Sequence, residues 1–132
     1  MTKIQNSKEF NEIVYYINNK NYSKALDKTK IISKKYPNEN IVLKLYATIY
    51  FNLMEWNNAI NYYKKILVFE KEKHKINTNI GVAYFKLGKI NKSINAFKDS
   101  IENDPNFRLA HINLGISYLE LSMLEKAIKH FV

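Results

Sequence analysis

The chain has 132 residues, of which 46% are hydrophobic and 14% aromatic, enough for a continuous core in stacked helices. It has no cysteine, which excludes disulfides, thiol catalysis and cysteine-ligated metal, and no stretch approaches the roughly 18 uncharged apolar residues of a membrane span. The formal net charge is +9, but Arg108 is the only arginine, so we expect no specific nucleic-acid partner.

A period of 34 residues organises the chain. It is marked by a column of tyrosines at Tyr16, Tyr50, Tyr84 and Tyr118. Fixed-period self-similarity is typical of a repeat protein. We therefore expect one domain over residues 1–132, divided into four repeats at about 6–39, 40–73, 74–107 and 108–132, the last incomplete.

Each repeat is expected to form two antiparallel helices, because apolar residues recur at three- and four-residue steps. Small side chains in matching columns should let the two helices of a repeat approach closely. The expected contacts are Ala47 with Ala59, Gly81 with Ser93, and Gly115 with Ala127.

The first repeat departs from this pattern. Ile13 occupies the small column, and Thr29 occupies the column that holds Tyr63, Phe97 and Phe131 in the other repeats. We expect this repeat to pack loosely or to act as an atypical cap, as terminal repeats often do.

Two further departures lie at the junctions. Residues 69–74 contain no proline, so the second repeat should run into the third through a longer helix or a tight charged turn. The sequence stops at Val132, partway through an expected eighth helix, which would leave an apolar face uncovered. We expect a fragment of a longer protein, with self-association through this end.

The columns resemble the tetratricopeptide repeat family, whose pattern runs Leu-Gly-x-x-Tyr, then Ala, Phe and Pro. Residues 80–84 read Ile-Gly-Val-Ala-Tyr, with Phe97 and Pro105 following, and residues 114–118 read Leu-Gly-Ile-Ser-Tyr, with Ala127 and Phe131 following. The resemblance implies an all-α fold, a right-handed α-α solenoid of antiparallel helix pairs. It also implies a non-catalytic interaction module that binds an extended or helical peptide segment in its concave groove.

The inward faces of the first helices would line that groove. Its lysines should favour an acidic protein or peptide partner. The candidate groove residues are Asn11, Val14, Lys44, Thr48, Phe51, Lys75, Asn79, Val82, Phe85, Lys86, Asn113 and Ile116.

Two binding modes of the family can be compared with these positions. The two-carboxylate clamp for chaperone tails needs lysine, two asparagines, lysine and arginine, and neither register of this chain completes that set. The groove asparagines look like those of O-linked N-acetylglucosamine transferase, where asparagine directly precedes the Leu-Gly pair. Asn11, Asn79 and Asn113 fall on that position, and Leu45 interrupts the series. An asparagine amide there could bond a peptide backbone through its donors and its acceptor.

No motif indicates catalysis. The three histidines show no zinc-binding spacing, and the three glycines are explained by helix packing or helix ends. We therefore expect no enzyme, metal or cofactor, and without a signal peptide we expect a cytoplasmic protein. Two alternatives stay open, namely the amino-terminal docking region of a larger enzyme such as a glycosyltransferase or sulfotransferase, and a three-repeat secretion chaperone.

Overall fold

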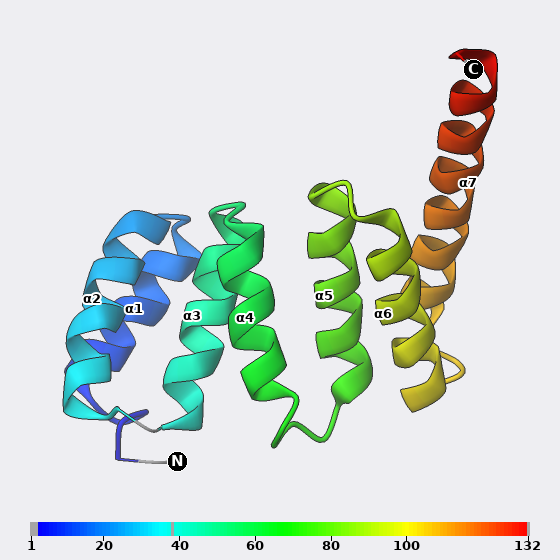
Figure 1. The fold of residues 1–132 in the computed structure, drawn as a ribbon. Helices are drawn as coiled ribbons and strands as arrows, with labels where there is room; N and C mark the ends of the chain where they lie inside the picture. Colours follow the sequence, from blue (N-terminus) through cyan, green and yellow to red (C-terminus); the bar gives the residue numbers. More distant parts are fainter. Residues whose placement is uncertain (1–2, 38, 132) are drawn as a thin grey trace. The chain divides into compact units, whose positions relative to one another are not determined.

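The computed structural model describes residues 3–37 and 39–131, with the side chains of residues 130 and 131 left out. In this part of the chain all regular structure is helical, which confirms the all-α fold. The helices are α1 (Lys8–Asn18), α2 (Tyr22–Lys35), α3 (Asn40–Asn52), α4 (Trp56–Ile66), α5 (Lys73–Lys86), α6 (Ile90–Asn103) and α7 (Arg108–Phe131) (Figure 1).

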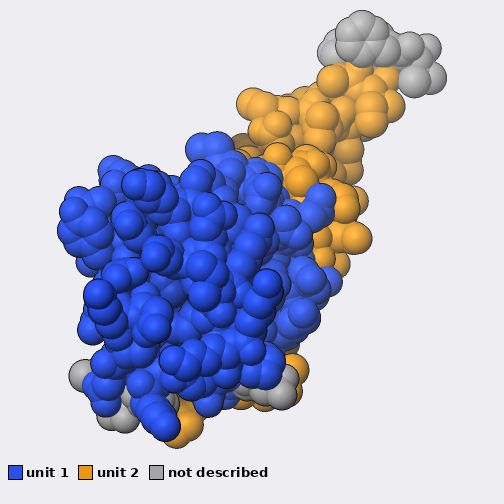
Figure 2. Space-filling model, turned by 90° about the vertical axis from the view of Figure 1, so that its left-hand side faces the viewer, with its two compact units in different colours: residues 1–66 blue, residues 67–132 orange. Residues whose placement is uncertain are grey.

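The chain divides into two compact units (Figure 2). Unit 1 covers residues 1–66 and holds α1 to α4, and unit 2 covers residues 67–132 and holds α5 to α7. The segment before α5 is a charged turn rather than a longer helix, and in it the Glu70 carboxylate accepts hydrogen bonds from the amides of Lys71 and Glu72. The expectation of one domain over residues 1–132 stays a prediction.

The first helix of each of the first three pairs ends in the same way. At the end of α1, α3 and α5, the carbonyls of Tyr16, Tyr50 and Tyr84 accept the amide of the residue five positions later, at 2.8, 3.0 and 2.9 Å. This is the Schellman ending of a helix, which needs one residue with positive φ. The residues that take it are Lys20 (φ 58°), Met54 (φ 61°) and Gly88 (φ 76°). The 34-residue period therefore fixes the turn as well as the helices.

In the first pair, α1 and α2, the two residues that depart from the pattern are buried. Ile13 and Thr29 are both completely buried, and the Thr29 hydroxyl donates to the Ala25 carbonyl at 2.7 Å. A larger side chain on the first helix thus accompanies a smaller one on the second. The expectation that this repeat packs loosely or acts as an atypical cap stays a prediction.

Three tyrosines stack on one another between α3 and α4. The rings of Tyr46 and Tyr62 lie 4.8 Å apart, and Tyr50 lies 5.7 Å from Tyr62. Lys65 Nζ sits 4.9 Å from the centre of the Tyr62 ring, and the Tyr46 hydroxyl donates to Ser33 Oγ at 3.0 Å. Burial raises the pKa of Tyr50 and of Tyr62 above the ordinary value of a tyrosine, and the neighbouring tyrosines add to this effect.

In unit 2, buried hydroxyls bond neighbouring helices. Thr78 Oγ1 on α5 lies 2.8 Å from Ser100 Oγ on α6, and Ser100 also donates to the His74 carbonyl. Ser93 Oγ on α6 lies 3.3 Å from Ser117 Oγ on α7, and both serines are completely buried. The ring of Phe97 fills the space that the missing side chain of Gly81 leaves.

The fourth helix pair is absent. Residues 108–131 form one continuous helix, α7, so the expected contact between Gly115 and Ala127 is wrong. Both residues are exposed on the same helix, and a Cβ at Gly115 would find no atom within 4 Å. Ser122 occupies the position of Lys20, Met54 and Gly88 in the period, but it is helical, and the chain does not turn there.

Candidate functional site

A cavity of about 190 Å³ opens in unit 2, bordered by residues of α5, α6 and α7. Five of the predicted groove residues line it together with Phe97. The lining residues are Val82, Phe85, Lys86, Phe97, Asn113 and Ile116.

Helix geometry explains why these residues meet. Val82, Phe85 and Lys86 stand three and four positions apart on α5, which places them on one face of that helix. The first half of α7 is held against the rest of unit 2, because Ala110 and Ser117 are completely buried. Asn113 and Ile116 are then presented at the same opening as the α5 residues.

The chemistry of the cavity is an apolar wall with a polar edge. Phe85 and Val82 are half-buried, while Lys86 is exposed at the rim. The Asn113 amide is half-buried and could donate to or accept from a bound main chain. Such a site can hold one apolar side chain and bond the backbone beside it.

The asparagine ladder is not confirmed. Asn79 is half-buried on α5 and already has an interaction partner within the chain. Asn113 lies at the cavity, whereas Asn11 in unit 1 is exposed and borders a different, shallow depression with Tyr15 and Tyr16.

The other predicted residues have separate surroundings. Lys75 on α5 pairs with Glu72 at 3.0 Å. On α3, Thr48 is exposed, and the ring of Phe51 packs edge-on to Trp56, with the ring centres 5.2 Å apart. Val14 is half-buried on α1.

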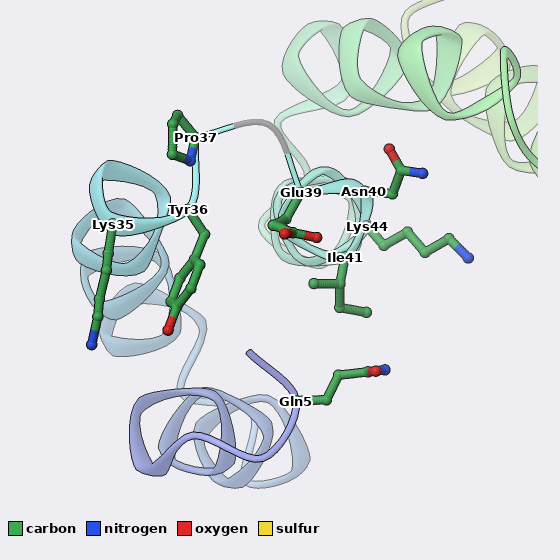
Figure 3. Close-up of a pocket in the computed structure, with 8 residues that line it drawn as sticks. All are labelled: Gln5, Lys35, Tyr36, Pro37, Glu39, Asn40, Ile41 and Lys44. Carbon is green, nitrogen blue, oxygen red and sulfur yellow. The ribbon is translucent and has the colours of Figure 1, made fainter. Parts of the chain in front are cut away.

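Lys44 lines a larger hollow of about 630 Å³ within unit 1. Figure 3 shows that its lining comes from Gln5 before α1, from the end of α2 with the loop that follows, and from the first turns of α3. This hollow was not predicted from the sequence, because its lining combines helix ends with residues of the loop between α2 and α3. The full lining is Gln5, Lys35, Tyr36, Pro37, Glu39, Asn40, Ile41 and Lys44.

Phe97 lines the cavity although it is not among the predicted groove residues. It belongs to a column that is aromatic in three of the four repeats, and its ring lies against Gly81. The same ring also forms part of the cavity wall. The pairing of an aromatic residue with a glycine was therefore the sequence feature that could have indicated this part of the cavity wall.

Among the described residues, no helix is both long enough and apolar enough to cross a membrane.

Sequence comparison finds one repeat family. A family model described as a TPR repeat, the abbreviation for tetratricopeptide repeat, matches residues 81–122. This stretch contains α6 and the cavity residues of α7. No curated protein gives a significant match.

Several solved structures have a fold similar to that of this chain. MamA AMB-1 superposes with a TM-score of 0.76 at 19% identity, over 93% of this chain and 67% of that chain. The first TPR of Spaghetti (RPAP3), bound to the HSP90 peptide SRMEEVD, has a TM-score of 0.72 at 20% identity, over 85% of this chain and 89% of that chain. The second TPR domain of human RPAP3, in complex with the HSP70 peptide SGPTIEEVD, has a TM-score of 0.71 at 15% identity, over 83% and 92%.

None of these three is described as an enzyme, so the comparison lends no support to the alternative of a docking region in a larger enzyme. At identities of 20% or less, the likeness concerns the fold alone. The family match and these structures together support the resemblance to tetratricopeptide repeats, and the fold of the chain is that of a helical repeat protein.

Proposed function

We propose that unit 2 binds an extended or helical segment of a partner protein, and that the cavity beside α5 and α7 takes one apolar side chain of that segment. The observation that carries the proposal is the convergence of five predicted groove residues with Phe97 on one cavity. Similar folds that hold peptides, those of RPAP3, support it.

The size of the cavity favours a peptide over a metabolite. Small-molecule sites usually measure about 300–1,000 Å³ and enclose most of the ligand. A cavity of about 190 Å³ is smaller, and suits a single anchoring side chain. Peptides in helical grooves are held by such anchors, with the main chain bonded alongside.

Lys86 should make the site prefer a negatively charged partner segment. It is exposed at the rim of the cavity, so an acidic residue next to the anchor would gain attraction without losing much hydration. We therefore expect an acidic partner segment with one bulky apolar residue.

The chaperone-tail sequence EEVD is not the expected ligand. The clamp positions counted from the first repeat hold Phe10, Val14, Leu45, Lys75 and Asn79. Counted from the second repeat they hold Lys44, Thr48, Asn79, Leu109 and Asn113, and neither set completes the clamp. Lys75 of the first set already pairs with Glu72. A peptide that ends in EEVD is accordingly a useful negative control.

The test is a peptide-library screen on the full chain, followed by calorimetry of the best binder. Ile116→Lys places a charge at the cavity and should weaken binding at least tenfold. Leu109→Lys is the matched control, because Leu109 is a similarly exposed apolar residue of α7 that does not line the cavity. It should leave the affinity within about twofold.

Two further variants separate the contributions. Asn113→Ala should cost about 0.5–1.5 kcal/mol, the usual net value of a hydrogen bond, which corresponds to roughly two- to tenfold in affinity. Lys86→Glu should weaken acidic peptides only, and more strongly at low salt. Equal losses for Ile116→Lys and Leu109→Lys would place binding elsewhere and contradict the proposal.

A further inference from the structure

The second half of α7 carries apolar residues that nothing in the described chain covers. Every described side chain from 122 to 129 is exposed, including Leu124 and Ile128. Ile128 is 62% exposed and Leu124 46%. Isolated exposed apolar residues are ordinary, but a row of them along one helix indicates an interaction surface.

The repeat period indicates which kind of helix surface would pack against residues 123–131. Leu124, Ala127 and Ile128 stand 34 residues after Ile90, Ser93 and Ile94, which are buried where α6 packs on α5. The partner for the 123–131 segment is thus a helix with the pattern of α5, and residues 108–121 carry that pattern. On this face Gly115 has an empty neighbourhood, and Tyr118 is 45% exposed.

The segment cannot reach residues 108–121 of its own chain while α7 is straight. With a rise of about 1.5 Å per residue, Ala127 lies about 18 Å along the helix axis from Gly115. Closing the hairpin would require Ser122 to leave the helix and adopt a positive φ, a conformation that costs Lys20 and Met54 free energy in their turns and costs Gly88 none.

We infer that the occupant of this face is a second copy of the chain. Two α7 helices pair antiparallel about a twofold axis near Ser122, so that residues 123–131 of each copy pack on residues 108–121 of the other. This exchange leaves both helices straight and reproduces the contact of an internal repeat twice. Exchanging an identical element between protomers is a low-cost route to a dimer, and the twofold arrangement uses the same patch on both subunits. The inference does not depend on the peptide site.

The natural absence of cysteine makes the pairing testable by disulfides. Gly115→Cys with Ala127→Cys places two thiols in columns that meet within a repeat. Ala47→Cys with Ala59→Cys is the matched control, because the same columns are buried between α3 and α4 of one chain. On a non-reducing gel, the control should run as an oxidised monomer, whereas the test pair should give a covalent dimer.

The position of Ser122 gives an independent control. Ser122→Gly removes the conformational cost of the turn, and should shift the cysteine pair at 115 and 127 from interchain to intrachain disulfides. Light scattering on the cysteine-free proteins should find a dimer for the wild type and a larger monomer fraction for Ser122→Gly. Leu124→Lys with Ile128→Lys should give a monomer with unchanged helix content.

Three results would overturn the inference. An intrachain disulfide between positions 115 and 127 without the Ser122 change would mean that the hairpin closes within one chain. A wild type that stays monomeric at tens of micromolar would remove the second copy. A dimer that fails to cross-link, while the control pair does, would mean that the copies meet through another face.

Discussion

The ring of Phe97 lies directly on Gly81, so close that a Cβ at residue 81 would stand 2.5 Å from Cε1 and 2.7 Å from Cδ1 of the ring. Carbon atoms do not approach to this distance without displacement. Because Phe97 is 1% exposed, its ring has little room to move away except toward the cavity that it lines. Glycine at residue 81 is therefore required by contact, not by backbone conformation.

Gly81→Ala should destabilise unit 2. Overpacking costs about 1–3 kcal/mol, and the better helix propensity of alanine returns at most about 1 kcal/mol. Denaturant unfolding of Gly81→Ala, Phe97→Leu and the double variant forms a double-mutant cycle. The shorter side chain of leucine should make room, so the alanine should cost less in the Phe97→Leu background. Additive effects would mean that the ring does not limit residue 81.

The Schellman turns predict opposite effects for glycine at equivalent positions. Met54→Gly and Lys20→Gly should each stabilise the chain by up to about 1 kcal/mol, because a left-handed backbone costs a residue other than glycine about 1–2 kcal/mol. Met54 is 71% exposed, so the core loses little with its side chain. Gly88→Ala should destabilise by a similar amount, although a Cβ there would meet no atom within 4 Å. Thermal unfolding measures all three, and a lower melting temperature for both glycine variants would contradict the assignment.

The tyrosine stack predicts a loss of stability in strong alkali. The pKa values of Tyr50 and Tyr62 are raised in the folded chain, mainly by burial. Below the unfolded value of about 10 both states hold the proton, and the contribution to stability is fully present. As the pH rises above about 10, the unfolded chain loses these protons first, so the free energy of unfolding falls.

Melting temperatures between pH 9 and 11 test this loss. Tyr62→Phe should make the decline with pH shallower. Tyr15→Phe removes a hydroxyl from an exposed ring and is the control, so its decline should follow the wild type. If the melting temperature of Tyr62→Phe fell with pH as steeply as that of the wild type, the loss of stability would not come from the stacked tyrosines.

The net charge of +9 predicts weak attraction to nucleic acids without selectivity. Binding of DNA or RNA should be insensitive to sequence, and its logarithm should fall linearly with the logarithm of the salt concentration. Fluorescence anisotropy across several sequences and salt concentrations checks both points. Tight binding of one sequence at physiological salt would contradict the expected absence of a specific nucleic-acid partner.

The register of the repeats was predictable because it depends on local features. The end of α5 at Gly88, the small residue at Gly81 and the bulky one at Phe97 all follow from the period and from side-chain size. Five of the cavity residues were predicted from the same register, namely Val82, Phe85, Lys86, Asn113 and Ile116. A period fixes which helix face a residue occupies, and the cavity lies where two such faces meet.

The form of α7 was not predictable from the period. The pattern around Ala127 would be the same in a closed hairpin and in an exchanged one, because the contacting residues are identical. In the structure Ser122 is helical, so helix propagation prevails over a turn at this residue. The surroundings of Asn79 were not predictable either. Its position in the repeat predicted an amide available to a ligand, but the residue has an interaction partner within the chain, which depends on tertiary packing and not on the repeat pattern.

The balance of sizes at Ile13 and Thr29 bears on any attempt to redesign the chain by consensus. Consensus engineering would replace Thr29 with an aromatic residue, as in the other repeats, and would expect a gain. Ile13 and Thr29 are both completely buried, so an aromatic ring at position 29 alone would overfill the site. Only the paired change, with Ile13 made glycine or alanine, restores the total volume. A transplant of α1 or α2 from another repeat would therefore have to bring both residues of this pair together.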